Sequence, residues 1–151
     1  MVGELSGRGR SARVLLVDAD GRVLLQKAAS GHWYTPGGRL DPHETLTQGA
    51  VREIREETGL ELAEDAFSGV LLERYVCFTL ADGRQYEADE SYVAAHVAAF
   101  TPDESGLEPG EELLIAEQRW WSVAEIRVAT VPVWPEQLAD LVEQVLATAA
   151  R

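Results

Sequence analysis

The sequence predicts an α/β fold in which a mixed β-sheet is covered by helices on its faces. Three observations support this: runs rich in β-branched residues alternate with turn residues, two segments have helical periodicity, and no repeat or linker divides the chain. The 151 residues, 46% of them hydrophobic, suit one domain with a buried core. We expect a single domain over residues 11–151, preceded by a flexible Gly/Arg/Ser-rich segment over residues 1–10.

The first half of the chain predicts a hairpin, a loop and a helix. Residues 12–17 and 22–27 are rich in β-branched residues and leucine, and they flank Asp-Ala-Asp-Gly, which is typical of a tight turn closed by glycine. Residues 31–39 are rich in glycine, proline and aromatic residues, and we expect them to form a loop. Residues 45–58 then have the 3.6-residue periodicity of an amphipathic helix.

The second half predicts a longer hairpin followed by short elements. Residues 69–80 and 85–100 are expected to be two long strands joined by a short turn. An acidic loop containing two prolines and two glycines should follow over residues 101–110. Residues 117–122 predict a short strand, and residues 123–126 a helical turn.

The chain closes with a predicted amphipathic helix over residues 136–149, with Pro135 at its start. Its apolar positions recur at helical spacing: Leu138, Leu141, Val142, Val145 and Leu146. This face is suited to packing against the sheet, and it is equally suited to packing against a second copy of the chain.

The charge of the chain limits the classes of partner. Its 26 acidic and 13 basic residues give a formal charge of −13, so nucleic-acid backbones and anionic lipid surfaces should repel it. Long nucleic acid and membranes are therefore unlikely partners by composition. Residues 61–117 hold 14 of the acids against two arginines, so the acidity lies in the two long strands and the loop after them. A phosphate-bearing substrate would need a cation to offset this charge.

The lone cysteine, Cys77, excludes an internal disulfide framework and a cysteine-based zinc site. We expect it to be a buried small apolar residue. The apolar run at residues 14–17 is too short for a signal-peptide core, and no stretch approaches the ~20 apolar residues that span a bilayer. The sequence therefore predicts a cytoplasmic protein without a membrane segment.

Residues 45–58 are specified as a helix at both ends. Thr45 and Gln48 have the spacing of a capping box, although Asp41-Pro42 offers a competing start. Gly59 stands where a left-handed residue commonly ends a helix. One arc of the helix carries its apolar residues, which are Leu46, Ala50, Val51 and Ile54.

Three glutamates on this helix are poorly placed for stability. Glu53, Glu56 and Glu57 repel one another at i, i+3 and i+4, and they lie near the C-terminal end, where the helix dipole disfavours anions. They could form a solvated acidic face compensated by Arg52 and Arg55. They could instead hold a divalent cation, because local rules tend to be broken at functional sites. Oxygen-only ligands favour Mg²⁺, Mn²⁺ or Ca²⁺ over Zn²⁺.

Here the chain resembles the Nudix (MutT-like) hydrolase family. The family's 23-residue box is matched at every position, by Gly38, Glu44, Arg52, Glu53, Ile54, Glu56, Glu57, Gly59 and Leu60. A chance match is expected roughly once in ten million chains of this length. Trp33-Tyr34-Thr35-Pro36-Gly37-Gly38 and Arg119-Trp120-Trp121 also resemble family segments, whereas His43 stands where many members have glycine.

The resemblance implies the Nudix fold, with the mixed sheet between helices (α/β/α), and hydrolysis of a diphosphate linkage with Mg²⁺ or Mn²⁺ as cofactor. It implies that Glu53, Glu56 and Glu57 bind the metal together with the carbonyl of Gly37 or Gly38. Arg52 should orient Glu53 or Glu56 through bidentate hydrogen bonds.

The other box residues are assigned mainly structural roles by the resemblance. Glu44 should help to fix the loop that enters the helix. Gly38 and Gly59 should be needed for the backbone conformation, and Ile54 and Leu60 should pack in the core. The general base is either a box glutamate or a carboxylate of a later loop. Among Glu111, Glu112 and Glu117 we favour Glu112, and the alternative is that all three only keep this loop soluble.

The substrate is not encoded in the box. Six aromatic residues could stack on a base, although packing in the sheet or core is the more common role: Trp33, Tyr75, Phe78, Tyr86, Tyr92 and Trp134. Arg74 and Arg84 could meet phosphate or could be solvated. We predict a hydrolase of a small nucleoside diphosphate derivative or nucleotide. The alternatives are removal of pyrophosphate from RNA 5′ ends and a Nudix-fold module that senses a nucleotide without cleaving it. Dimers are common in the family, so a homodimer is an open expectation.

Overall fold

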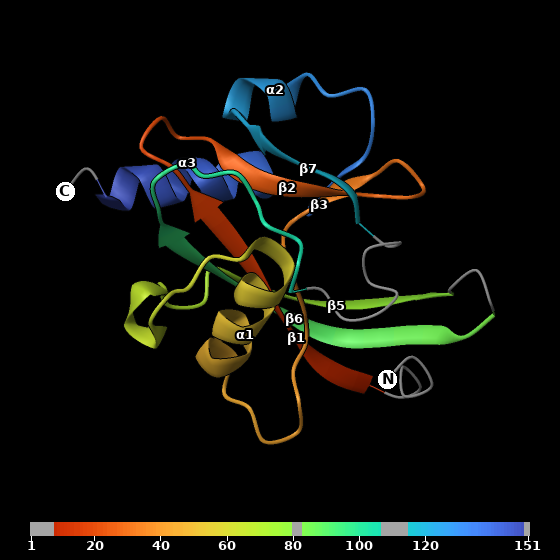
Figure 1. Ribbon diagram of the computed structural model, residues 1–151. Coiled ribbons are helices and arrows are strands. Elements are labelled where there is room, and N and C mark those ends of the chain that lie inside the picture. The colour runs from red at the N-terminus through yellow and green to blue at the C-terminus, as the bar shows by residue number, and fades with distance from the viewer. Residues whose placement is uncertain (1–7, 80–82, 107–114, 150–151) are drawn as a thin grey trace.

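A curled, mixed eight-stranded sheet forms the centre of the computed structural model, which describes residues 8–79, 83–106 and 115–149 (Figure 1). The elements follow in the order β1 (Arg8–Val17), β2 (Val23–Ala28), β3 (Trp33–Tyr34), β4 (Gly37–Arg39), α1 (Leu46–Thr58), the 3-10 helix η2 (Glu64–Ala66), β5 (Leu72–Thr79), β6 (Gln85–His96), β7 (Ile115–Trp121), α2 (Val123–Arg127), β8 (Val133–Trp134) and α3 (Leu138–Ala149).

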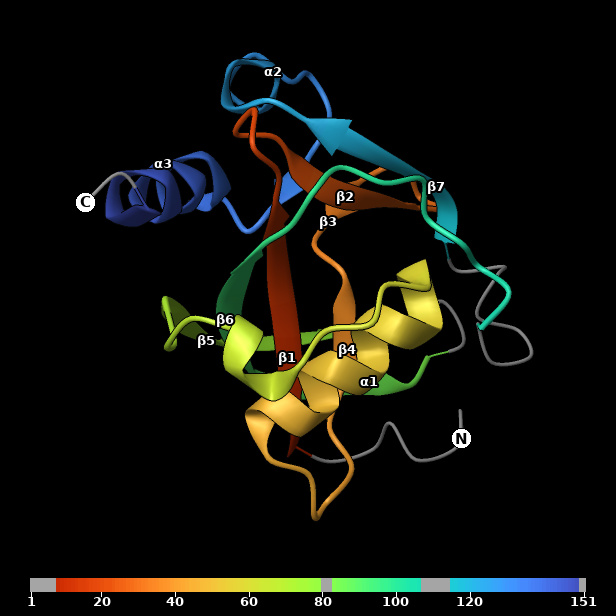
Figure 2. The ribbon, with the colours of Figure 1, turned by 60° about the vertical axis from the view of Figure 1, so that its left-hand side comes forward.

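The sheet divides because β1 and β2 part soon after their hairpin turn. They share only the register pair Val17↔Val23. Beyond it, β1 pairs with β4 on one side and runs parallel to β6 on the other, whereas β2 pairs with β3 and β7. We call β5, β6, β1 and β4 the first limb, and β2, β3, β7 and β8 the second limb. Figure 2 shows the two limbs diverging, with α1 below the second limb and against the first.

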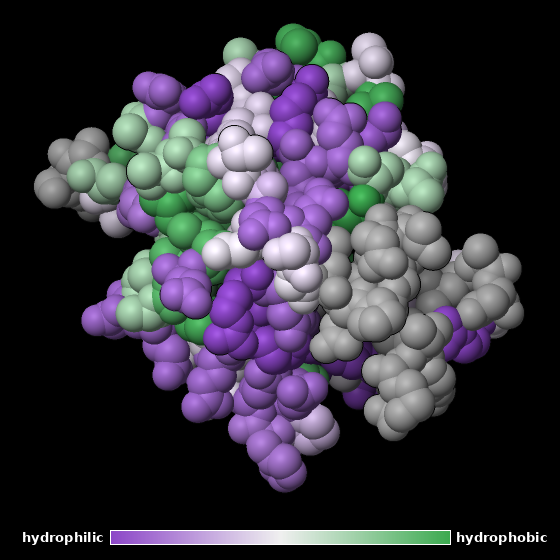
Figure 3. Space-filling view, in the orientation of Figure 1, coloured by the Kyte–Doolittle hydropathy of each residue, from purple (hydrophilic) through white to green (hydrophobic). Residues whose placement is uncertain are grey.

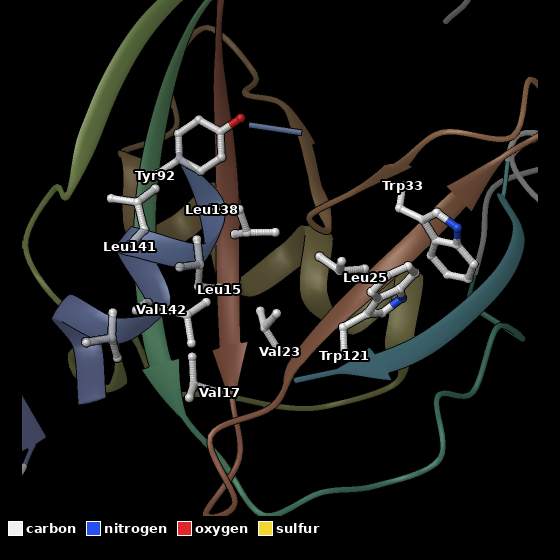
Figure 4. Close-up of a cluster of buried hydrophobic side chains, with 12 residues drawn as sticks. Leu15, Val17, Val23, Leu25, Trp33, Tyr92, Trp121, Leu138, Leu141 and Val142 are labelled. Carbon is white, nitrogen blue, oxygen red and sulfur yellow. The ribbon is translucent and has the colours of Figure 1, made fainter. Parts of the chain in front are cut away.

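Alternation along β1 gives the sheet an apolar surface on both faces. Leu15 and Val17 belong to the cluster under α3, whereas Val14 and Leu16 pack with Ile54 of α1. Figure 4 shows the α3 side, where Leu138 and its helical neighbours lie over the strands. The predicted arrangement of a sheet between helices is therefore confirmed.

The ends of α1 are those that the sequence predicts. Thr45 and Gln48 form both hydrogen bonds of the capping box, so the competing start at Asp41-Pro42 is not used. Gly59 ends the helix with φ of 81°, a left-handed conformation that suits glycine. These caps fix the two ends of the helix, and the packing of Ala50 and Ile54 fixes the face that its glutamates occupy.

Several predicted boundaries were wrong. Residues 31–39 were expected to be a loop, but they contain the short strands β3 and β4. Strand β1 begins at Arg8 rather than at residue 12; residues 8–10 pair with β6, and Arg8 forms an ion pair of 2.6 Å with Asp89. β5 begins at Leu72 and β6 ends at His96, which makes the long hairpin shorter than expected at its open end.

Cys77 is exposed, so its predicted burial was wrong. It lies on β5, the outermost strand of the first limb, where the 3.8 Å contact from Sγ to Gln85 Oε1 is its hydrogen bond. An edge strand with one open side cannot bury all its small apolar residues. Among the described residues, none of the helices has the length and apolar character needed to cross a membrane.

Candidate active site

The box glutamates lie on the side of α1 that faces β4 and the end of β2. Glu53 and Glu57 are one helical turn apart and are buried, with 7% and 3% of their surface exposed. Glu56 lies beside them and is more accessible. Figure 3 shows mainly hydrophilic side chains on the outer surface over α1. Two buried carboxyl groups so close together require a proton, a donor or a cation.

Glu57 is held by two donors from different elements. Its Oε1 accepts hydrogen bonds from Gln26 Nε2 at 2.9 Å and from the backbone N–H of Gly37 at 3.3 Å. Burial, followed by the neighbouring Glu53 carboxyl, raises the pKa of Glu57 well above its usual value despite these donors and the nearby Arg13. Ionising Glu57 therefore costs free energy in this site, and a bound cation would reduce that cost.

Arg52 contacts three box carboxylates. Its bidentate partner is Glu44, with Nε to Oε2 and Nη2 to Oε1 both at 2.7 Å. Nη1 donates to Glu53 Oε1 at 2.9 Å and to Glu56 Oε2 at 3.4 Å. The expected bidentate bond to Glu53 or Glu56 was wrong in detail, because the Nε–Nη2 edge of the guanidinium is bonded to Glu44 and only Nη1 donates to Glu53 and Glu56. The pKa of Glu44 is lowered chiefly by this hydrogen bond.

Gly37 and Gly38 bring the backbone against these carboxylates. A Cβ on Gly38 would lie 2.9 Å from Cδ and Oε1 of Glu53, so only glycine leaves room for this carboxyl group. Gly37 has φ of 140°, and a Cβ there would lie 2.0 Å from the carbonyl oxygen of Ala12. Both glycines are therefore required by close approach.

The candidate metal ligands in this region are carboxylate and carbonyl oxygen atoms, which Mg²⁺ and Mn²⁺ prefer. The repulsion between the Glu53 and Glu57 carboxyl groups suits a hard divalent cation. In the part of the chain that the structure describes, no three acidic, histidine or cysteine side chains already converge as a preformed cation site. Glu56 is drawn toward Arg52, so we expect it to turn from the guanidinium when a cation binds.

A second polar cluster, which the sequence did not predict, lies beside Gly37. Arg13 Nη1 donates to the carbonyls of Thr35 at 3.3 Å and Gly37 at 3.2 Å, and its Nε donates to Glu90 at 3.0 Å. Glu90 also accepts from Arg74 at 2.9 Å. Arg74 is therefore engaged in an ion pair rather than solvated.

Tyr34 lies next to this cluster, with its ring centroid 5.8 Å from the Arg13 guanidinium. Burial and the Glu57 carboxylate raise the pKa of Tyr34 to about 12. The sequence signal that could have revealed these residues is a charged or amide residue within an apolar strand, as Arg13 and Gln26 both are. Glu90 gave no such signal, because it stands among other acidic residues of β6.

The remaining predicted residues lie elsewhere. Glu111 and Glu112, the favoured base, are outside the described residues. Glu117 is exposed on β7 opposite Lys27. Trp33 is buried and packs edge-on against Trp121 at 5.1 Å, which is core packing, as is the burial of Tyr86 and Tyr92. Tyr75, Phe78 and Trp134 are exposed.

Comparison with known proteins identifies the family. The model of the NUDIX domain matches residues 7–143 of this chain. The chain belongs to the Nudix family. This matched range contains the whole box and all the site residues described above.

Solved structures of low sequence identity share the Nudix fold. The MutT protein of Methanosarcina mazei is 22% identical, with a TM-score of 0.66 over 95% of this chain and 96% of that one. The NUDIX domain of Shewanella oneidensis NrtR, solved with ADP ribose, is 17% identical, with a TM-score of 0.67 over 93% of this chain and 90% of that one. At these identities the likeness establishes the fold.

Curated relatives are matched over only part of their own length. An m7GpppN-mRNA hydrolase of Bos taurus is 38% identical over 79 residues, which are 46% of this chain and 26% of that protein. The chain spans 26–37% of the length of three curated relatives that it matches. Activities of those longer proteins therefore do not transfer to it directly.

Proposed function

We propose that the chain is a metal-dependent Nudix hydrolase that cleaves the diphosphate linkage of a small nucleoside diphosphate derivative or nucleotide. The observation that carries this proposal is the buried Glu53–Glu57 carboxyl pair, which lies against Gly37 and Gly38 with Arg52 bonded to Glu53. A stability role does not explain why two carboxyl groups are buried side by side.

The proposed cation would be held by Glu53, Glu56 and Glu57 with the carbonyl of Gly37. When bound, Mg²⁺ or Mn²⁺ supplies charge neutralisation of the diphosphate and acidification of water. Arg52 donates to Glu53 at 2.9 Å and would orient that carboxylate toward the cation. Glu112 stays our candidate for the general base, and the box glutamates Glu53 and Glu56 are the alternatives.

A small substrate is supported by the net charge of −13, which opposes binding of a long polyanion. The structural relative solved with ADP ribose carries such a small diphosphate. The similarity to an mRNA-cap hydrolase favours keeping capped RNA as a second candidate substrate. A cytoplasmic location and a homodimeric state remain predictions from composition and family resemblance.

The decisive experiment measures phosphate and pyrophosphate release from a panel with and without Mg²⁺. The panel contains nucleoside di- and triphosphates, dinucleotides, nucleotide sugars including ADP ribose, and capped and triphosphorylated RNA. We expect turnover of a small member only with the cation. Turnover of RNA alone would replace the small-substrate proposal. A raised melting temperature without turnover of any member would favour the sensing module.

Glu57→Gln should lower kcat/KM on the best substrate by about 100-fold or more while the protein stays folded. The matched control is Glu61→Gln, an exposed glutamate just beyond the helix, which should keep parental activity. If Glu57→Gln turns over its best substrate as fast as the parent, the assignment of the cation site is wrong.

A further inference from the structure

Gln26 is a fully buried amide in a strand whose preceding residues are apolar. Its exposed fraction is 0%, and Val23, Leu24 and Leu25 before it are equally buried. Among the described residues, its carbonyl oxygen Oε1 has no hydrogen-bond partner. A buried polar atom left unpaired costs about 1–3 kcal/mol, so an apolar side chain would be the more stable choice here. The amide must therefore be explained by what its NH₂ group does.

The NH₂ group of Gln26 is directed at Glu57. Nε2 donates to Glu57 Oε1 at 2.9 Å and to Gln118 Oε1 at 3.4 Å. The backbone N–H of Gly37 donates to the same Oε1 at 3.3 Å, whereas the second oxygen, Oε2, takes neither bond. Two donors on one oxygen fix the orientation of the carboxylate, which also lies within hydrogen-bonding distance of the Glu53 carboxyl group.

Gln118 holds the backbone of the same residue. It lies directly opposite Gln26 in the register of β2 and β7. Its Nε2 donates to the carbonyl of Glu57 at 2.8 Å, in the last turn of α1, where carbonyls lack helical partners. The two glutamines therefore attach both the side chain and the main chain of Glu57 to the second limb, although α1 packs on the first.

We propose that Gln26 is a positioning residue that orients the Glu57 carboxylate for binding a divalent cation, with Gln118 fixing the helix end behind it. This inference rests on the cation site of the proposed function. It adds a residue outside the box, on a different strand, whose effect is transmitted only through Glu57. Simple core packing would not require the amide, because a methionine of similar shape would fill the same space.

The test measures Mn²⁺ affinity of the metal-free protein without substrate, by electron paramagnetic resonance of free Mn²⁺. Gln26→Met removes the donor and keeps the size of the side chain, and we expect affinity to fall about tenfold. Gln85→Met changes an exposed glutamine on β6 and should leave affinity unchanged. Circular dichroism melting verifies folding, and Gln26→Leu is the second variant if Gln26→Met does not fold.

A double-variant comparison separates positioning from a general disturbance. The Glu57→Gln variant keeps Glu53 and Glu56, so it should still bind Mn²⁺ weakly at higher concentration. In this background, Gln26→Met should lower the Mn²⁺ affinity by less than twofold. A full tenfold loss in that background would overturn the proposed path through Glu57. Parental affinity in a folded Gln26→Met or Gln26→Leu variant would overturn the role of Gln26 alone. Absence of Mn²⁺ binding by the parent would overturn the proposed cation site together with this inference.

Discussion

Gly38 has no room for a side chain because the Glu53 carboxyl group lies against its backbone. A methyl group there would lie 2.9 Å from Glu53 Cδ and Oε1, which are the end of a movable side chain. Gly38→Ala should therefore displace the carboxyl group and leave the fold intact. We expect kcat/KM on the best substrate to fall about 100-fold, as for an active group misplaced by about 1 Å.

The control for this prediction is Gly69→Ala, because a Cβ at Gly69 meets no atom within 4 Å. Both variants should melt near the parent temperature. If Gly38→Ala keeps full activity, the position of the Glu53 carboxyl group does not matter for the reaction. If it unfolds, Gly38 is needed for the strand rather than for the carboxylate.

At the residue scale, the sequence predicted the box positions and missed the residues that hold them. Glu53 and Glu57 stood out because like charges recur at helical spacing. Gln26 on β2 donates to Glu57 across 31 positions of the chain, and Arg13 on β1 donates to the carbonyl of Gly37 across 24 positions. Such contacts depend on how the limbs diverge, which no local spacing encodes.

At the scale of elements, the capping box fixes where α1 begins. Thr45→Ala removes the hydrogen bond from Gln48 N to Thr45 Oγ1, at 3.2 Å. We expect a loss of about 1 kcal/mol, measured by urea unfolding, and a melting temperature lower by about 3 °C. Thr101→Ala, at an exposed loop position, should change neither value. Equal effects of the two variants would rule out a specific contribution of the cap.

Long elements were predictable and two-residue elements were not. The caps and periodicity of α1 gave its start and end, and the β1–β2 hairpin followed from its turn. By contrast, β3 and β8 have two residues each, which is too few to carry an alternation. They exist because β3 pairs with β2 on one side and with β8 on the other. Pairing across the chain is a tertiary property.

At the scale of the whole molecule, Glu90 joins three strands of the first limb. It accepts hydrogen bonds from Arg13 on β1 and from Arg74 on β5. Burial would raise the pKa of Glu90, but the two guanidinium groups outweigh it and hold the pKa below its usual value. Because the folded pKa is lowered, the stabilisation is present above about pH 4.3, the unfolded value, and is lost as the pH falls through the folded pKa.

Glu90→Gln should therefore destabilise the protein by about 3 kcal/mol at pH 7, since it leaves two arginines facing each other. The difference from the parent should shrink as the pH falls below about 4.3. Urea unfolding across this range measures it, with Glu73→Gln, an exposed glutamate on β5, as the control. A difference independent of pH would show that the charge of Glu90 contributes nothing.

The exposed thiol of Cys77 gives the protein a natural attachment point for a probe. It is the single cysteine of the 151 residues, and β5 is separated from β1 by β6. A maleimide dye or a nitroxide added to the unmodified chain will attach at one known position. Fluorescence and spin-label studies of this protein can therefore begin without engineered cysteines, and its storage requires a reductant to prevent disulfide-linked pairs.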